Sequence, residues 1–284
     1  MDEYTLDLDR LRRWIGRTKD QTETVSASWC NRLAATLDRE GDLQDGDVLP
    51  ALWHFITHPP LVATAELDVD GHAMRGDFLP PVALPRRMWA GSRFTFHRDL
   101  YIGDEVTKTS TIENIEMKQG RSGALCFVTI SHTLSVAGEV RISEAQDLVF
   151  REAATNAAPS KSSAGETRQE DFTRTVAPSE ILLFRYSALT FNSHRIHYDR
   201  EYVTGVEGYP GLIFHGPLTA TLLANLAVEE TGERLVAFSF RGWAPLFDTA
   251  DFTMSGVRNG SDVELWATTP QGATAMTATA TLGR

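Results

Sequence analysis

The sequence predicts an α+β protein in which two similar halves each combine an antiparallel sheet with one apolar helix. Residues 152–170 lack any large apolar side chain and are rich in alanine, serine and charge, which is typical of a linker. We therefore divide the chain into an N-terminal unit of residues 1–151, a linker of residues 152–171 and a C-terminal unit of residues 172–284.

The two halves repeat each other loosely. A Phe-x-Phe motif that begins at Phe94 returns at Phe238, 144 residues later (238 minus 94). The turn at Gly123 resembles the turn at Gly272, 149 residues later (272 minus 123). Half of the 284 residues is 142, so both offsets fit a duplicated fold.

Each half contains a candidate helix and several candidate strands. Residues 25–39 and 218–230 form the two helices, and residues 107–117 and 125–136 have the alternation and β-branched content of strands. Between the first helix and its sheet, residues 41–88 hold six of the twelve prolines. We expect this stiff insertion to lie across the surface as an ordered flap or clasp.

Composition excludes several classes of function. The net charge of −11 argues against nucleic acid or an anionic membrane as a partner, since both reward basic surfaces. Cys30 and Cys126 lie in apolar segments without metal-site spacing, which predicts small buried side chains. The N-terminus has no targeting pattern, and no run of about 18 apolar residues occurs. We expect a cytoplasmic protein.

Chemistry-bearing side chains gather just before the second helix. They are Asn192, His194, His197 and His215, followed by Gly216 and Pro217. A helix N-terminus presents free N–H groups and a positive dipole end to developing negative charge, and proline suits the first helical position. An imidazole beside such a terminus indicates a proton-transfer site. No histidine precedes His54, so we expect one catalytic site per chain, in the second half.

Each of these residues also has a simpler interpretation. His197 could only hydrogen-bond to its loop, Asn192 could form an Asx turn, and Gly216 could serve helix packing alone. Their occurrence together at this spacing favours catalysis. A three-histidine metal site lacks a supporting carboxylate pattern.

This stretch resembles the hydratase motif of the MaoC-like family, in which an Asp, and a His five residues later, precede a His-Gly helix start. Asn192 stands at the place of the Asp and His197 at that of the His. Residues 191–199 are similar to the type 2 hydroxyacyl-thioester dehydratase branch, which includes itaconyl-CoA and mesaconyl-C4-CoA hydratases and in which Asn is usual. Further segments are similar to this branch, at residues 49–54, 79–93, 118–123 and 144–152.

The resemblance implies a double hot-dog fold, in which two antiparallel sheets, each wrapping a helix, are fused in one chain. It also implies a CoA-thioester substrate, no cofactor and no metal, and we expect a homo-oligomer. His197 would act as the base, Asn192 would orient water, and the Gly216 N–H would bind the thioester oxygen. The candidate substrate contacts are Trp89, Arg93, Arg195, His194 and His215.

Three functions compete. The first is a hydratase of a short dicarboxylic enoyl-CoA, such as itaconyl-CoA or mesaconyl-C4-CoA, that gives citramalyl-CoA. Its second carboxylate would need an arginine, with Arg93 and Arg195 ahead of Arg87, although Arg195 could instead pair with Asp199. The second is a 3-hydroxyacyl-thioester dehydratase of fatty acid or polyketide synthesis. The third is an acyl-CoA-binding protein with a decayed site.

The linker assignment makes a direct prediction. Limited proteolysis should cut first within residues 152–170, because their composition cannot support a core. The fragments would be identified by mass spectrometry. A first cut inside residues 125–136 would contradict the division into units.

Overall fold

The computed structural model describes residues 7–120, 123–152 and 169–283, which include one antiparallel sheet of ten strands. The elements of the first half are α1 (Leu8–Arg12), β1 (Thr18–Thr24), α2 (Ala27–Thr36), η1 (Trp53–Ile56), η2 (Thr64–Glu66), β2 (Arg86–Phe96), β3 (Glu105–Gly120), β4 (Gly123–Val136) and β5 (Glu139–Arg151). Those of the second half are β6 (Phe172–Val176), α3 (Glu180–Leu189), η3 (Arg195–His197), α4 (Arg200–Gly205), α5 (Gly216–Thr231), β7 (Arg234–Gly242), β8 (Phe252–Asn259), β9 (Asp262–Thr268) and β10 (Thr274–Gly283).

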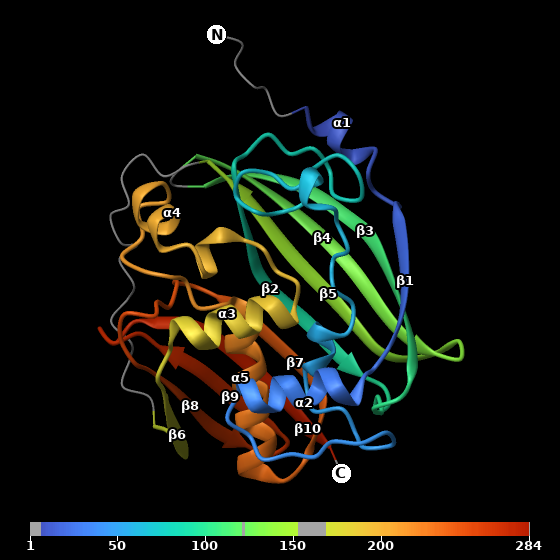
Figure 1. The fold of residues 1–284 in the computed structure, drawn as a ribbon, viewed down its shortest axis with the longest axis vertical. Helices are drawn as coiled ribbons and strands as arrows, with labels where there is room; N and C mark the ends of the chain where they lie inside the picture. The colour runs from blue at the N-terminus through green and yellow to red at the C-terminus, as the bar shows by residue number, and fades with distance from the viewer. Residues whose placement is uncertain (1–6, 121–122, 153–168, 284) are drawn as a thin grey trace.

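The strand order shows the duplication. It runs β1-β3-β4-β5-β2-β7-β10-β9-β8-β6, so each half contributes five neighbouring strands (Figure 1). Read inward from either edge, the order is the same: an edge strand, a three-stranded meander, and the strand that follows the insertion or helix. At the centre, Phe94 of β2 lies opposite Phe238 of β7. Repeat-related residues therefore face each other, which confirms the offset of 144 residues.

The second predicted offset is wrong. Gly123 opens β4, whereas Gly272 precedes β10, and the counterpart of β4 in the strand order is β9. The two turns look alike because both glycines adopt a positive φ, of 116° and 82°. Such glycines occur in many tight hairpins, so they do not identify which hairpin they belong to.

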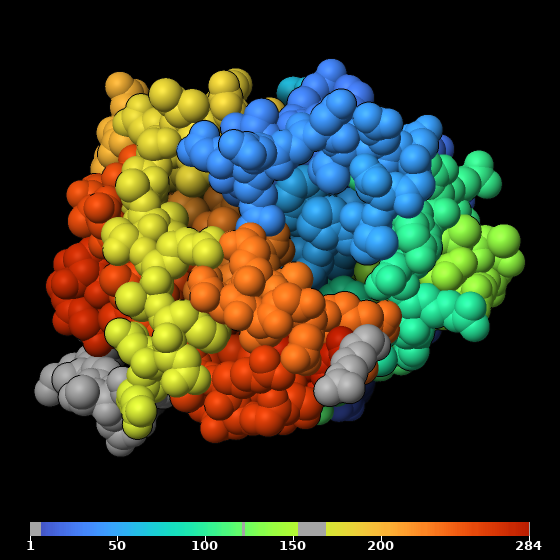
Figure 2. Space-filling model, turned by 90° about the horizontal axis from the view of Figure 1, so that it is seen from below, coloured from blue at the N-terminus to red at the C-terminus, as the bar shows by residue number. Residues whose placement is uncertain are grey.

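The expected double hot-dog fold is present, with two refinements. The two sheets are continuous, because β2 pairs with β7. Only one of the two predicted helices lies mainly on the sheet: α5 contacts β7, β9 and β10, whereas the principal contacts of α2 are with α3 and η1. Figure 2 shows the blue segment of the first half against the yellow and orange segments of the second.

The α5 helix is a central helix of the core. Side chains around most of its circumference are buried, which is expected of a helix that is apolar on all faces. Gly232 ends it with a φ of 69°, as glycine commonly does. No helix in the described part of the chain has the length and apolarity needed to cross a membrane.

One apolar cluster extends through both halves, and a second lies within the first half. Cys30 and Cys126 are buried free thiols in these two clusters, as predicted. β5 ends at Arg151 and β6 begins at Phe172. Most of the predicted linker, residues 153–168, lies outside the described residues, so the division into units stays a prediction.

The insertion of residues 41–88 reaches across to the loop that carries the candidate catalytic residues. The Arg195 N–H donates to the Asp70 carbonyl at 2.9 Å, and the Ser193 hydroxyl donates to the Gly71 carbonyl at 2.5 Å. A Cβ atom on Gly71 would overlap the Ser193 carbonyl oxygen. The insertion is therefore a clasp that holds this loop by its backbone.

Replacing Gly71 with alanine should loosen the clasp. Gly46, also in the insertion, provides the control, because it has a similar φ (+94° against +87°) but no atom within 4 Å of an added Cβ. Gly46→Ala should lower the free energy of unfolding by about 1–2 kcal/mol through backbone strain, and Gly71→Ala by a further ~1–3 kcal/mol through overlap. Urea denaturation would measure both. Equal losses would contradict the clasp.

Candidate active site

The candidate catalytic residues lie on the loop that follows α3 and at the start of α5. Phe191 adopts a left-handed φ of 51°, which reverses the chain after α3. The Asn192 N–H then donates to the Ser187 carbonyl at 2.8 Å, and η3 places His197 against Ile213 in the segment that leads into α5. The loop is thus fixed by its own backbone as well as by the clasp.

His197 is buried and oriented by a single strong contact. Its Nδ1 lies 2.7 Å from the Ile213 carbonyl oxygen, so Nδ1 carries the proton and Nε2 has the free lone pair. Nε2 has no hydrogen-bond partner among the described residues. Burial lowers the pKa of His197 to about 4, which keeps the ring neutral at physiological pH and ready to accept a proton.

Two more imidazoles flank His197. The His215 ring stacks on it with a centroid distance of 3.7 Å and an interplanar angle of 18°, and His215 Nε2 is 2.9 Å from the Ser187 hydroxyl. The His194 ring stands edge-on to it at 5.5 Å. Burial lowers the pKa of His194 and His215 below the ordinary histidine value, and the neighbouring imidazoles add to this. All three rings are therefore neutral.

Gly216 opens α5 directly after His215. Its N–H donates to no other group of the described chain, and a Cβ on Gly216 would meet nothing within 4 Å. Pro217 follows within the first turn. The start of this 16-residue helix therefore combines an unpaired N–H group, the positive end of the helix dipole and open space.

Asn192 forms the Asx turn of its simpler interpretation and also has an amide group that is available to a ligand. Its Oδ1 accepts the His194 N–H at 3.1 Å, as in an Asx turn. Its side chain also lines a cavity, and its Nδ2 has no partner among the residues the structure describes. The turn fixes the amide while leaving its N–H donors available.

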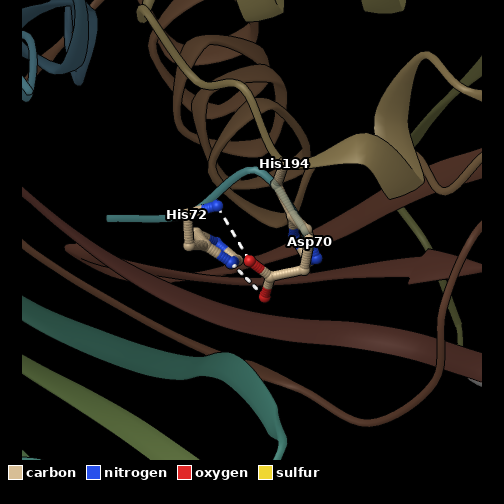
Figure 3. A group of neighbouring side chains, drawn as sticks. All are labelled: Asp70, His72 and His194. Carbon is tan, nitrogen blue, oxygen red and sulfur yellow. Dashed lines mark hydrogen bonds and ion pairs between the residues drawn. The ribbon is translucent and has the colours of Figure 1, made fainter. Parts of the chain in front are cut away.

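The clasp adds two residues that the sequence analysis did not find. Asp70 accepts hydrogen bonds from the His72 N–H at 2.8 Å and from His72 Nδ1 at 2.9 Å (Figure 3). The His72 ring lies 3.9 Å from the His194 ring. A carboxylate therefore approaches a site whose motif has an amide in the place of the family's Asp. Asp-x-His in the insertion was the available signal, but only the fold brings it to residue 194.

Asp70, His72 and His194 are also the residues that could hold a metal ion. One donor atom from each lies within 4.8 Å of the others. Both oxygens of Asp70 are engaged by His72, so hydrogen bonding already accounts for the arrangement. Burial lowers the pKa of His72 to about 4.

A cavity of about 230 Å³ adjoins the loop and is lined by both halves. Its lining residues are His54, Phe55, His58, Trp89, Lys108, His132, Leu134, Glu144, Gln146, Tyr186, Thr190, Asn192 and Pro217. Trp89, a predicted substrate contact, is one of these lining residues. The cavity reaches the first turn of α5 through Pro217, and Tyr186 packs edge-on against the His215 ring at 4.9 Å.

The two arginines preferred for a substrate carboxylate lie elsewhere. Arg93 is exposed and pairs with Asp147 at 2.7 Å, and Arg195 pairs with Asp199 at 2.8 Å. Neither lines the cavity, so we do not retain them as carboxylate ligands. The third choice, Arg87, makes no side-chain hydrogen bond within the described residues, and burial lowers its pKa to about 10.

Comparisons with known proteins identify relatives of the chain. The family model for hydroxyacyl-thioester dehydratase type 2 matches residues 52–248. The chain is 45% identical to the mesaconyl-C4-CoA hydratase of Chloroflexus aurantiacus, with 95% of this chain and 97% of the relative aligned. It is 26% identical to the mitochondrial hydroxyacyl-thioester dehydratase type 2 of Schizosaccharomyces pombe, over 69% of this chain and 73% of that one.

Solved structures share the fold. HtdX of Mycobacterium tuberculosis superposes with a TM-score of 0.67 at 18% identity, over 93% of this chain and 99% of that one. Another M. tuberculosis protein with a double hot-dog fold gives a TM-score of 0.57 at 11% identity, over 95% and 96% of the two chains. The family model and the 45% identical relative show that the chain belongs to the hydroxyacyl-thioester dehydratase type 2 family of MaoC-like proteins and is an enzyme of the hydro-lyase type.

Proposed function

We propose that this enzyme adds water to a short dicarboxylic enoyl-CoA, with mesaconyl-C4-CoA as the preferred substrate, itaconyl-CoA as the second and citramalyl-CoA as the product. The 45% identity to a mesaconyl-C4-CoA hydratase supports the substrate class. The observation that carries the reaction is the unpaired His197 Nε2 on the loop that leads to the unpaired Gly216 N–H.

The start of α5 would stabilise the thioester oxygen. In mesaconyl-C4-CoA, water attacks the β-carbon of the α,β-double bond, and negative charge moves onto the thioester carbonyl oxygen as the enolate forms. An N–H that already points into open space can bind this oxygen without reorganisation, and the helix dipole favours the same charge. Gly216 suits this role because it leaves room for the thioester to approach its backbone.

His197 and Asn192 would handle the water. Nε2 of His197 accepts a proton from the water as its oxygen bonds to the β-carbon, and the resulting imidazolium can return a proton to the α-carbon. The Ile213 carbonyl holds the Nδ1 proton throughout and stabilises the charged ring. The free Asn192 amide would orient the water without titrating.

A dehydratase acting on longer hydroxyacyl thioesters is the second candidate. The 26% identical yeast relative is named as such an enzyme. The cavity of about 230 Å³ lies below the range of about 300–1,000 Å³ common for ligand pockets, which favours a short acyl group. Initial rates with mesaconyl-C4-CoA, crotonyl-CoA and a ten-carbon enoyl-CoA would separate the two. Preference for the ten-carbon substrate would reject the dicarboxylate proposal.

Removal of the base should abolish most activity. His197→Ala should lower kcat by roughly 100-fold or more while leaving the fold intact. His97→Ala is the matched control, because His97 is exposed just after the end of β2 and its ring hydrogen-bonds only to Ser143 among the described residues. Hydration assays would measure kcat for both variants, and circular dichroism would show whether each variant is folded. Near-full activity in a His197→Ala/Asn192→Ala double variant would place the site elsewhere.

The pH dependence follows from the buried imidazoles. Because the pKa of His197 in the folded enzyme is about 4, the acid limb of kcat/KM should fall near pH 4 and not near 6.5. As the pH falls, the free energy of unfolding should decrease at a higher pH than the one at which activity is lost. His54, His132 and His72 have pKa values lowered to about 3, 3 and 4, so the unfolded chain binds more protons below about pH 6.5.

The free energy of unfolding should therefore be fully present above about pH 6.5 and should fall progressively towards pH 4. Rates at each pH would be measured over seconds, before unfolding, and stability by urea titration. An acid limb at pH 6.5 with unchanged stability would contradict the neutral, buried state of these rings.

A further inference from the structure

A belt of polar side chains crosses the inner face of the first-half sheet. Apolar residues flank it on each strand: Val106 and Ile112 on β3, Ile130 and Leu134 on β4, Ile142 and Leu148 on β5. Between them lie Lys108 and Ser110 on β3, His132 on β4, and Glu144 and Gln146 on β5. Ser110, His132 and Glu144 are buried, and Lys108 and Gln146 are half-buried. Such burial of polar groups opposes stability unless they are paired or serve a ligand.

Most members of this polar belt are paired with one another. His132 Nδ1 is 2.8 Å from the Ser110 hydroxyl and its Nε2 is 3.3 Å from Gln146 Oε1. Ser92 of β2 donates to Glu144 at 2.7 Å. The belt is therefore a built network, with fixed positions for its side chains.

Lys108 is the exception. Its ammonium group makes no hydrogen bond or ion pair with any residue that the structure describes. Glu144 attracts it, but β4 lies between β3 and β5, which separates the two backbones by about 10 Å. Burial lowers the pKa of Lys108 and raises that of Glu144, because it disfavours the charged form of each group.

Lys108 also lies at the cavity that adjoins the candidate site. It lines the same cavity as Asn192 and Pro217, and it is the one lysine or arginine among the lining residues. The histidines His54 and His132 are kept neutral there by burial and by the charge of Lys108. An anionic group that enters the cavity beside Asn192 would thus meet one free cation.

We propose that Lys108 binds the free carboxylate of a short dicarboxylic acyl thioester and so selects this substrate over a simple enoyl thioester. This inference rests on the proposed function and extends it to specificity. In mesaconyl-C4-CoA the carboxylate is attached to the carbon that water attacks, so it must lie close to the residue that orients the water. Asn192 and Lys108 line the same cavity, which meets this requirement.

Binding without turnover tests the proposal independently of the reaction. Succinyl-CoA carries a terminal carboxylate and butyryl-CoA lacks it, and both are saturated. Calorimetry on the full-length enzyme should show tighter binding of succinyl-CoA, and Lys108→Met should weaken it about 100-fold while changing butyryl-CoA binding by less than about 3-fold. Lys108→Arg should keep part of the preference. Lys19→Met, an exposed lysine on the edge strand β1, should change neither.

The unfolding temperature separates carboxylate binding from a purely structural role of Lys108. If Lys108 only stabilised the fold, its removal would lower this temperature. Removing an unpaired, half-buried cation should leave the unfolding temperature of Lys108→Met equal or higher. Equal binding of the two thioesters by the unmodified enzyme would overturn the proposal, as would a Lys108→Met variant with unchanged preference or with a collapsed fold. If the preference depends on Lys108 but mesaconyl-C4-CoA is not hydrated, the proposed function fails and the carboxylate site stands.

Discussion

The pairing of β2 with β7 is the constraint on which the rest of the structure depends. It makes one sheet from two halves and places Phe94 opposite its repeat counterpart Phe238. The rings of Phe94, Phe238 and Phe240 lie 6.3 to 6.4 Å apart, within the range of favourable aromatic contacts. Because this seam fixes the two inner faces relative to each other, residues of both halves can line one cavity.

The two halves have diverged in their use of the same plan. In the second half, the long helix α5 lies on the sheet, and the start of α5 forms part of the candidate site. In the first, the shorter α2 contacts mainly α3 and η1, which leaves part of its sheet face to line the cavity. The polar belt occupies this face. The insertion also connects the halves, through hydrogen bonds to the loop that carries the candidate catalytic residues.

This arrangement gives the missing carboxylate of the motif a structural context. Asn192 cannot act as a base, but the clasp places Asp70 and His72 beside His194. The site therefore retains one carboxylate near its imidazoles, delivered from the other half of the chain. The neutral state of His197 needs no such partner, because burial and the Ile213 carbonyl already fix its protonation and orientation.

The sequence predicted those parts of the site that are local in the chain. Asn192 and His197 lie on the loop after α3, and His215 and Gly216 lie at the start of α5, with only the short α4 between them in the chain. Spacing and resemblance were therefore enough. Asp70 and His72 required knowledge of a contact across more than a hundred residues, which local patterns do not contain.

Lys108 did have a signal in the sequence. Period-two alternation places it on the same strand face as Val106 and Ile112, which are both buried. However, a lysine within a strand pattern usually indicates a side chain that faces solvent. Arg195 shows the opposite case, since its spacing of four residues from Asp199 already favoured the ion pair that the structure contains.

A crystal structure of the enzyme with succinyl-CoA bound would test the central claim most directly, namely that one cavity joins the helix start of the second half to the polar belt of the first. The account predicts the thioester oxygen on the Gly216 N–H and the terminal carboxylate within hydrogen-bonding distance of Lys108 Nζ. A carboxylate that points to Arg87 or to solvent, with the acyl group outside this cavity, would contradict it.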